Sequence, residues 1–147
     1  MPREVFDFID AKINEKVERE LGREPNTDNR ISLAAVDGNK LVAIAVGATE
    51  SGYERYKKQD CADLMAIYID PLYQHLGLGK KLFDKVVDFF KKQGCTKMVI
   101  GVLKENIQAR KAYEKWGGQL DENYEGFHET LGKKYPVVFY LYDLTGL

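Results

Sequence analysis

A glycine-bearing segment between two apolar stretches has residue types that suit the binding of an anion. It reads Gln74-His75-Leu76-Gly77-Leu78-Gly79 and follows the apolar run DLMAIYID, which predicts a buried strand over residues 63–70. Beyond the segment, apolar residues recur at helical spacing up to Gly94. At such a junction the first N–H groups of the helix lack an intrahelical partner and the helix dipole is positive. The pattern therefore predicts a phosphate-binding loop.

The glycines of this loop have two explanations. Gly77 and Gly79 lack the Cβ atoms that would keep a diphosphate away from the backbone, and Lys80 and Lys81 add positive charge nearby. Alternatively, the glycines only permit the turn from strand to helix. Both explanations stay open on the residues alone.

Two well-known phosphate motifs do not fit these letters. A Walker A loop needs glycine where Gln74 stands and Ser or Thr where Lys81 stands. A dinucleotide fingerprint counted from Gly77 needs a small third residue where Leu82 stands. Neither a P-loop nor a dinucleotide-binding turn is predicted.

Cysteine and histidine do not form a recognisable metal or nucleophile site. Cys61 and Cys95 flank apolar runs, where a free cysteine behaves as a small hydrophobe, and no Cys/His ligand spacing is present. No Cys or Ser stands with a positioned base, which argues against covalent catalysis. We therefore expect no metal and no acyl-enzyme intermediate.

The first part of the chain predicts a helix and a hairpin. Apolar residues share one helical face as far as Gly22, namely Phe6, Ile9, Ile13, Val17 and Leu21. The runs ISLAAVD and KLVAIAVGAT, separated by Gly38-Asn39, predict a β-hairpin. Residues 50–60 then form a polar connector that bears tyrosines.

After the loop and its helix, TKMVIGV predicts another buried strand. Asn106 suits the N-cap of a helix whose apolar face carries Ala109, Ala112, Tyr113 and Trp116. Gly117-Gly118 ends this helix, and VVFYLYDL predicts the final strand after a charged stretch. The order of elements predicts a mixed α/β (α+β) sheet flanked by helices, in a single domain over residues 1–147.

Composition excludes several classes of protein. A net charge of -1 and a pI near 6.2 do not suggest a nucleic-acid binder. The charged N-terminal residues and the absence of a long apolar run predict neither a signal peptide nor a membrane anchor. We expect a cytoplasmic protein with no nucleic-acid or membrane partner.

Two blocks together resemble the GNAT acetyltransferases. The first is the pattern Q-x-x-G-x-G after a strand, and the second is NIQARKAYEKWG, from Asn106 to Gly117. The resemblance covers residues 63–118 through motifs and the flanks through their order of elements. It implies the acyl-CoA N-acyltransferase fold and transfer of an acetyl group from acetyl-CoA to a primary amine.

The resemblance also implies which residues would contact the cosubstrate. The family's loop backbone wraps the CoA diphosphate, which here corresponds to Gln74, His75, Leu76, Gly77, Leu78, Gly79 and Lys80. The strand that pairs with the pantetheine arm corresponds to Ile67, Tyr68 and Ile69. The side chain at Asn106 would hold the arm, although a plain helix cap explains the same residue.

Two residues match the family's acid and base. Tyr113 corresponds to a tyrosine that protonates the departing thiolate, although packing on the apolar face of its helix would also explain it. Asp63 stands where some members carry a carboxylate that accepts the proton of the amine. The resemblance implies that Asp63 would do so through water. The alternative is a solvated aspartate at the end of the strand. Glu54 and Glu105 are weaker candidates.

The acceptor is not identified beyond a small-molecule or peptide amine. Two connectors, residues 50–60 and the charged stretch before the final strand, carry aromatic residues that could line its cleft, namely Tyr53, Tyr56, Tyr124, Phe127 and Tyr135. Acidic residues there suit a cationic amine, although loop charges are usually solvated: Glu50, Glu54, Asp60, Asp121, Glu122 and Glu125. His128 is a weaker candidate for contact with the acceptor, and His75 is expected at the surface.

A homodimer is compatible with the resemblance. The alternative function is that of a non-catalytic module that binds or senses acetyl-CoA.

Two features depart from the family pattern. Members usually begin with a strand, whereas here a helix is predicted almost at once. The second block usually ends in Gly-Phe, whereas Gly117 is followed by Gly118. The second difference is expected to alter packing beneath the last strands.

Overall fold

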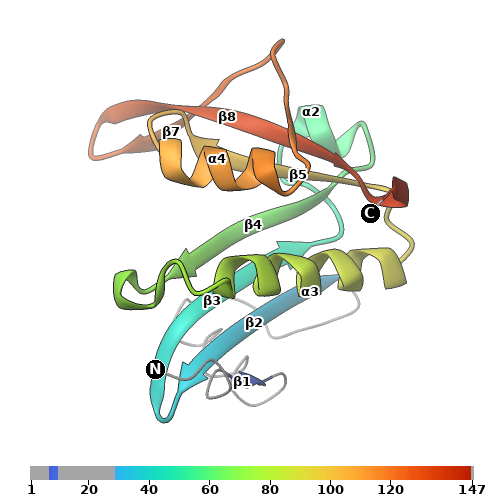
Figure 1. Ribbon diagram of the computed structural model, residues 1–147. Helices are drawn as coiled ribbons and strands as arrows, with labels where there is room; N and C mark the ends of the chain where they lie inside the picture. Colours follow the sequence, from blue (N-terminus) through green and yellow to red (C-terminus); the bar gives the residue numbers. More distant parts are fainter. Residues whose placement is uncertain (1–6, 10–28, 147) are drawn as a thin grey trace.

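The computed structural model describes residues 7–9 and 29–146, which form a mixed sheet with helices on both faces (Figure 1). The strand order is β1-β2-β3-β4-β5-β8-β6, and β7 pairs with β8 off this path. β4 and β5 are parallel, and the other pairs are antiparallel. The strands are β1 Asp7–Ile9, β2 Arg30–Asp37, β3 Lys40–Ala48, β4 Ala62–Ile69, β5 Lys97–Leu103, β6 Gln119–Leu120, β7 Gly126–Thr130 and β8 Lys133–Asp143. The predicted mixed α/β fold is confirmed.

Helices divide between the two faces of the sheet. α3 (Leu78–Lys92) and α4 (Ile107–Lys115) pack on the face that carries Leu64, Ile100 and Tyr140, which we call the helix face (Figure 1). The short α2 (Glu54–Lys57) packs on the opposite face, which carries Val99 and Phe139 and which we call the connector face. Single 3₁₀ turns lie at Pro71–Tyr73 and Leu144–Gly146. Among the described residues, no helix is long and apolar enough to cross a membrane.

The N-terminal half agrees with its predicted hairpin and differs from its predicted helix. β2 and β3 pair on either side of Gly38, whose φ of +62° is the left-handed conformation that a two-residue hairpin turn requires. Asp7–Ile9 is a strand paired with β2, so the helix predicted from Phe6 is wrong at these residues and the first strand is present. The rest of that helix lies outside the described residues.

β4 is buried on both faces only in its first half. Ala62, Asp63 and Leu64 are buried, whereas Met65 is 45% and Tyr68 59% exposed. The prediction of a strand buried throughout is therefore wrong for its second half. Its register with β3 shifts between Val46 and Gly47, so that Met65 has no partner residue on β3. This bulge lies two residues beyond Asp63, the last residue of β4 that pairs with β5.

The C-terminal part contains more strand than the sequence predicts. The charged stretch before the last strand includes β6 and β7, and β8 begins at Lys133, four residues before the predicted Val137. β7 and β8 form a hairpin through Leu131 and Gly132, both of positive φ. The hairpin is polar and largely exposed, so the hydrophobic alternation that signals a strand is weak there.

Candidate active site

The sheet opens between its two parallel strands. β4 and β5 pair only at Ala62 with Met98 and at Asp63 with Val99, and beyond Asp63 the strands have no further pairing. Figure 1 shows the two strands diverging toward the loop that leads to α3. The second half of β4 therefore presents an edge without a neighbouring strand on the side of β5.

Backbone groups of β4 point into this opening. The N–H of Asp70 donates to Val42 O of β3 at 2.8 Å, so residue 70 faces β3. Because consecutive residues of a strand direct their peptide groups to alternate edges, Ile69 and Ile67 face the opening. The side-chain amide of Gln74 reaches this edge and donates to Ile69 O at 3.3 Å. An extended, amide-bearing ligand could pair with this edge as an additional strand does.

The loop after β4 leads into the N-terminus of α3. Gly77 is the N-cap, with φ of +78°, and His75 also has a positive φ, of +66°. Among the described residues, the first N–H of α3 to donate a hydrogen bond is that of Lys81, to Gly77 O at 3.2 Å. The N–H groups that precede it are therefore available at the positive end of the helix dipole, as the sequence predicts.

Gly79 also has a packing role. A Cβ at this position would lie 2.9 Å from the Ile69 side chain and 3.3 Å from that of Trp116. The glycine thus allows α3 to pack closely against β4 and α4, in addition to the role expected of it in the loop. Lys80 and Lys81 are exposed, and Lys80 forms an ion pair with Asp84 one turn along the helix.

α4 carries the second block of the sequence motif. Asn106 is its N-cap, and its side-chain oxygen accepts the N–H of Ala109 at 3.1 Å. Tyr113 lies on the buried face of this helix, 9% exposed, with its ring centroid 5.8 Å from that of Trp116. Burial raises the pKa of the Tyr113 phenol, so the hydroxyl keeps its proton near neutral pH and can act as an acid.

Asp63 is buried at the point where β4 and β5 separate. It is 4% exposed and accepts a hydrogen bond from the Ser51 hydroxyl at 2.9 Å. Burial raises the pKa of Asp63 to about 6, and the hydrogen bonds from Ser51 and from the Gly52 backbone oppose this rise. The alternative of a solvated aspartate is therefore wrong, and the carboxylate has a proton affinity suited to a base near neutral pH.

Asp63 and Tyr113 lie on opposite faces of the opened sheet. Asp63 pairs with Val99, and because paired residues direct their side chains to the same side, Asp63 belongs to the connector face. Tyr113 packs with Ile100 and Tyr140 on the helix face. A group held in the opening could thus meet a base on one side and an acid on the other.

Aromatic residues of the two connectors separate into three sets. Tyr53 is 42% exposed and packs edge-on against Phe139 of the connector face, with ring centroids 4.8 Å apart. Tyr124 packs against the same ring at 5.6 Å. Tyr135 shares the connector face, because it lies two residues from Val137 on β8. Phe127 pairs with Pro136 and points to the helix face, and Tyr56 is fully buried.

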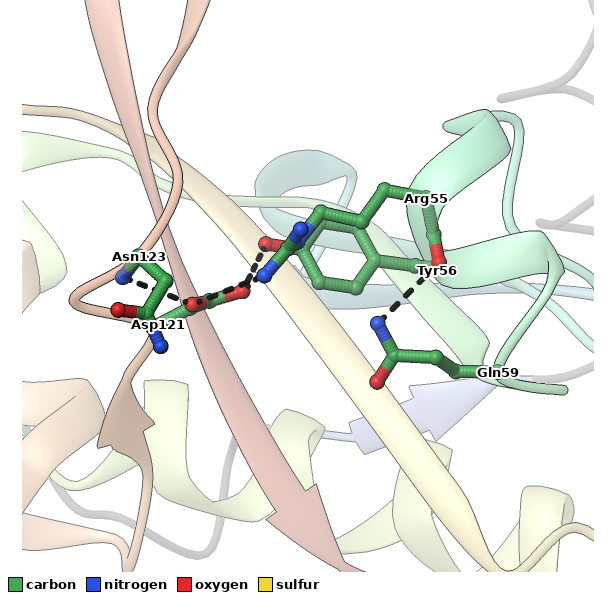
Figure 2. A network of polar contacts seen from close by, with 5 residues as sticks. All are labelled: Arg55, Tyr56, Gln59, Asp121 and Asn123. Carbon is green, nitrogen blue, oxygen red and sulfur yellow. Dashed lines mark hydrogen bonds and ion pairs between the residues drawn. The ribbon is translucent and has the colours of Figure 1, made fainter.

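A polar network fixes α2 to the loop after β6 (Figure 2). Asp121 accepts from Arg55 Nε at 3.1 Å and from the Tyr56 hydroxyl at 2.8 Å, and its side chain is 6% exposed. The Asn123 N–H donates to the same carboxylate at 3.1 Å, and the Arg55 guanidinium lies 5.0 Å from the Tyr124 ring centroid. These bonds lower the pKa of Asp121 even though burial acts in the opposite direction. The Asp121 carboxylate and the Tyr56 hydroxyl are thus occupied by contacts within the protein.

The sequence could not signal this network or the contact between Ser51 and Asp63. Arg55 and Asp121 are 66 residues apart, and nothing in their local patterns links them. Among the other acidic candidates, Glu50 pairs with Lys57 at 3.1 Å and Glu125 with Lys104 at 2.6 Å. Such surface pairs are the ordinary state of solvated loop charges.

The remaining acidic and histidine candidates lie at the surface. The exposed residues are Glu54, Asp60, Glu105, Glu122, His75 and His128. His75 is where it was expected, and His128 lies on β7 beside Tyr135 on the connector face. Both cysteines are free, and within the described residues no cluster of His, Cys, Asp and Glu could hold a metal ion.

Gly118 explains one departure from the family pattern. A Cβ there would lie 2.7 Å from the Tyr142 hydroxyl and 2.9 Å from Tyr113 O. The Tyr142 hydroxyl fills the space and donates to Tyr113 O at 2.6 Å. Tyr142 thus ties the end of α4 to β8, and a larger residue at position 118 would displace it.

Comparison with known proteins agrees with this geometry. The model of the acetyltransferase (GNAT) family matches residues 4–118. A thialysine N-epsilon-acetyltransferase of Bos taurus is 34% identical over 62 residues, which cover 42% of this chain and 36% of that protein. The chain thus aligns with about a third of the length of this curated relative.

Solved structures share the fold. Arabidopsis thaliana NAA60 in complex with a bisubstrate analogue has a TM-score of 0.72 at 17% identity, covering 94% of this chain and 98% of that one. An acetyltransferase of the GNAT family from Streptococcus pneumoniae has a TM-score of 0.66 at 25% identity, covering 88% and 76%.

Proposed function

Because the chain belongs to the acetyltransferase (GNAT) family, we propose that it transfers the acetyl group of acetyl-CoA directly to a primary amine of a small molecule or peptide. The observation that carries this proposal is the opening between β4 and β5, which has a buried carboxylate on one face and a buried phenol on the other. In a direct transfer, Asp63 would serve the amine on one side and Tyr113 the departing thiolate on the other.

The residues of the opening suit acetyl-CoA, which supplies the acetyl thioester. The free N–H groups at the start of α3 would hold its diphosphate, and Gly77 and His75 shape the loop around it. Ile67 and Ile69 would pair with the amides of its pantetheine arm, on the edge that β5 leaves open. The side-chain NH₂ of Asn106 is directed to no partner among the described residues and would donate to the same arm.

Proton transfer follows from the two faces. An alkyl amine has a pKa near 10.4 and must lose a proton before it can attack a carbonyl carbon. Asp63, whose pKa is about 6, would accept this proton, directly or through water. As the carbon–sulfur bond breaks, Tyr113 would give its proton to the departing sulfur and recover one from solvent.

The test is release of the CoA thiol in the presence of a panel of amines. A polyamine, a lysine-containing peptide, a peptide with a free N-terminus and an aminoglycoside cover the main acceptor classes. We expect release that depends on one class of amine and falls by roughly 100-fold in Tyr113→Phe. The alternative is a non-catalytic protein that binds acetyl-CoA. It would be supported if acetyl-CoA binds but no amine causes release of CoA, and if Tyr113→Phe binds acetyl-CoA as wild type does.

A further inference from the structure

Asp63 is held by a short loop that the motifs of the sequence do not include. Ser51, 2% exposed, lies at the start of this loop, and its N–H donates to Cys61 O at 2.9 Å, next to the first residue of β4. Its hydroxyl donates to Asp63 Oδ2 at 2.9 Å. The backbone N–H of Gly52 donates to the same carboxylate. Consecutive residues thus provide two donors to one buried carboxylate.

Ser51 Oγ both accepts and donates a hydrogen bond. The N–H of Tyr53 donates to Ser51 Oγ at 3.1 Å, so the oxygen already serves as an acceptor there. An ionised carboxylate can only accept, so the Ser51 hydroxyl donates to it, and this bond is stronger than a bond to the neutral acid. Protonation of Asp63 would weaken this bond.

Among the described side chains, Ser51 is the one that donates a hydrogen bond to Asp63; the Gly52 N–H is the backbone donor beside it. The residues paired with it on β3 and β5, Ala48 and Val99, are apolar. Tyr53 and Cys61 are the titratable groups whose charge interacts with that of Asp63, and burial raises the pKa of both, so both stay neutral near pH 6. Lys97, at the start of β5, and Asp60 act on the pKa of Cys61 in opposite directions.

We propose that Ser51 is a positioning residue of the acetyl transfer: its hydroxyl holds the Asp63 carboxylate at the opening between β4 and β5 and favours the ionised form that accepts the proton of the amine. This inference rests on the proposed function of Asp63 as the base. It adds a residue that lies outside both sequence motifs and acts through Asp63.

The first test is the pH dependence of kcat/KM in Ser51→Ala. Loss of one hydrogen bond to a carboxylate raises its pKa by about one unit. The acidic limb of the profile should therefore move up by about one pH unit, which lowers kcat/KM by about fivefold at pH 6 and hardly at all at pH 8. A loss of equal size at every pH would mean a merely structural role and would overturn the proposal.

Two further variants make this test specific. Ser51→Thr keeps the hydroxyl and should restore the wild-type profile. Ser32→Ala removes a hydroxyl that is also fully buried, on β2, and should leave the profile unchanged. A shift in Ser32→Ala as large as that in Ser51→Ala would contradict a specific role for Ser51.

A second readout does not need turnover. The titration of the Asp63 carboxyl carbon, followed by NMR and assigned with Asp63→Asn, should have a higher midpoint in Ser51→Ala than in wild type. If no amine is acetylated, the proposed function fails while this titration still decides what Ser51 does to Asp63. An unchanged midpoint would overturn the inference even in an active enzyme.

Discussion

At the scale of single residues, the environment of Asp63 gives it a role that its sequence position leaves open. An aspartate at the start of a strand is usually solvated, yet this one is 4% exposed and bonded to Ser51. Burial of a carboxyl group without a cationic partner costs stability. Since nothing in the fold of this region requires a charge at that point, the cost is consistent with a functional role.

Asp63→Asn separates function from stability. We expect kcat to fall by roughly 100-fold or more, because the base is lost while the shape is kept. A raised pKa means that the folded state binds the proton more tightly than the unfolded state. The contribution of Asp63 to stability is therefore greatest below about pH 4, is lost as the pH rises to about 6, and stays absent above it.

Asp63→Asn should not lose stability as the pH rises from 4 to 6. It should therefore unfold at an equal or higher temperature than wild type at pH 7, and the unfolding temperatures of the two proteins should converge near pH 4. Thermal unfolding across this pH range measures the difference. A variant that is less stable at pH 7 and fully active would show that Asp63 is a structural residue only.

At the scale of elements, α4 combines a helix cap with a candidate cosubstrate contact in Asn106. Aspartate at this position keeps the side-chain oxygen that caps Ala109 N–H but loses the NH₂ group, whereas alanine loses both. We expect Asn106→Asp to keep the wild-type stability and weaken acetyl-CoA binding by roughly tenfold. Asn106→Ala should weaken binding similarly and also destabilise the protein by about 1 kcal/mol.

Calorimetric titration and denaturant unfolding measure the two effects separately. If both variants bound acetyl-CoA with wild-type affinity, Asn106 would be a helix cap and not a contact of the cosubstrate.

α2 depends on its network with Asp121 for its position over the connector face. Asp121→Ala removes the acceptor of the buried Tyr56 hydroxyl and the partner of Arg55. We expect the unfolding temperature to fall by roughly 3–8 °C and the KM for the amine to rise, with little change in acetyl-CoA affinity. Glu122→Ala, at the exposed neighbour, is the matched control and should change neither. Equal effects of both variants would show that the network does not hold α2.

At the scale of the whole molecule, the sequence predicts the parts of the fold whose signal is local. The hairpin at Gly38, the strand-to-helix loop at Gly77 and the cap at Asn106 each depend on neighbouring residues, and all three are confirmed. Their order along the chain is enough to predict the mixed sheet.

Features that arise from long-range contacts could not be predicted in this way. The split of β4 from β5 leaves Tyr68 exposed in a run that otherwise has the pattern of a buried strand. The polar hairpin of β7 is stabilised by pairing with β8 rather than by an apolar face. Gly79 belongs to the phosphate motif, but only the contacts of its neighbours Ile69 and Trp116 show that it is required for packing.

The central claim, that the opening between β4 and β5 holds acetyl-CoA, is tested most directly by thermal unfolding with the ligand. Gly77→Asp places a carboxylate at the N-terminus of α3, and Gly77→Asn is its uncharged control; both residues tolerate positive φ better than others. At about 100 times the dissociation constant, acetyl-CoA should stabilise wild type by roughly 2.7 kcal/mol, or several degrees.

CoA should give a similar shift and ATP a smaller one, because ATP lacks the pantetheine arm. Gly77→Asn should retain most of the acetyl-CoA shift and Gly77→Asp should lose it. Stabilisation of wild type by acetyl-CoA but not of Gly77→Asp is the result we predict. No shift with acetyl-CoA or CoA, or an undiminished shift in Gly77→Asp, would contradict the claim that this opening is the cosubstrate site.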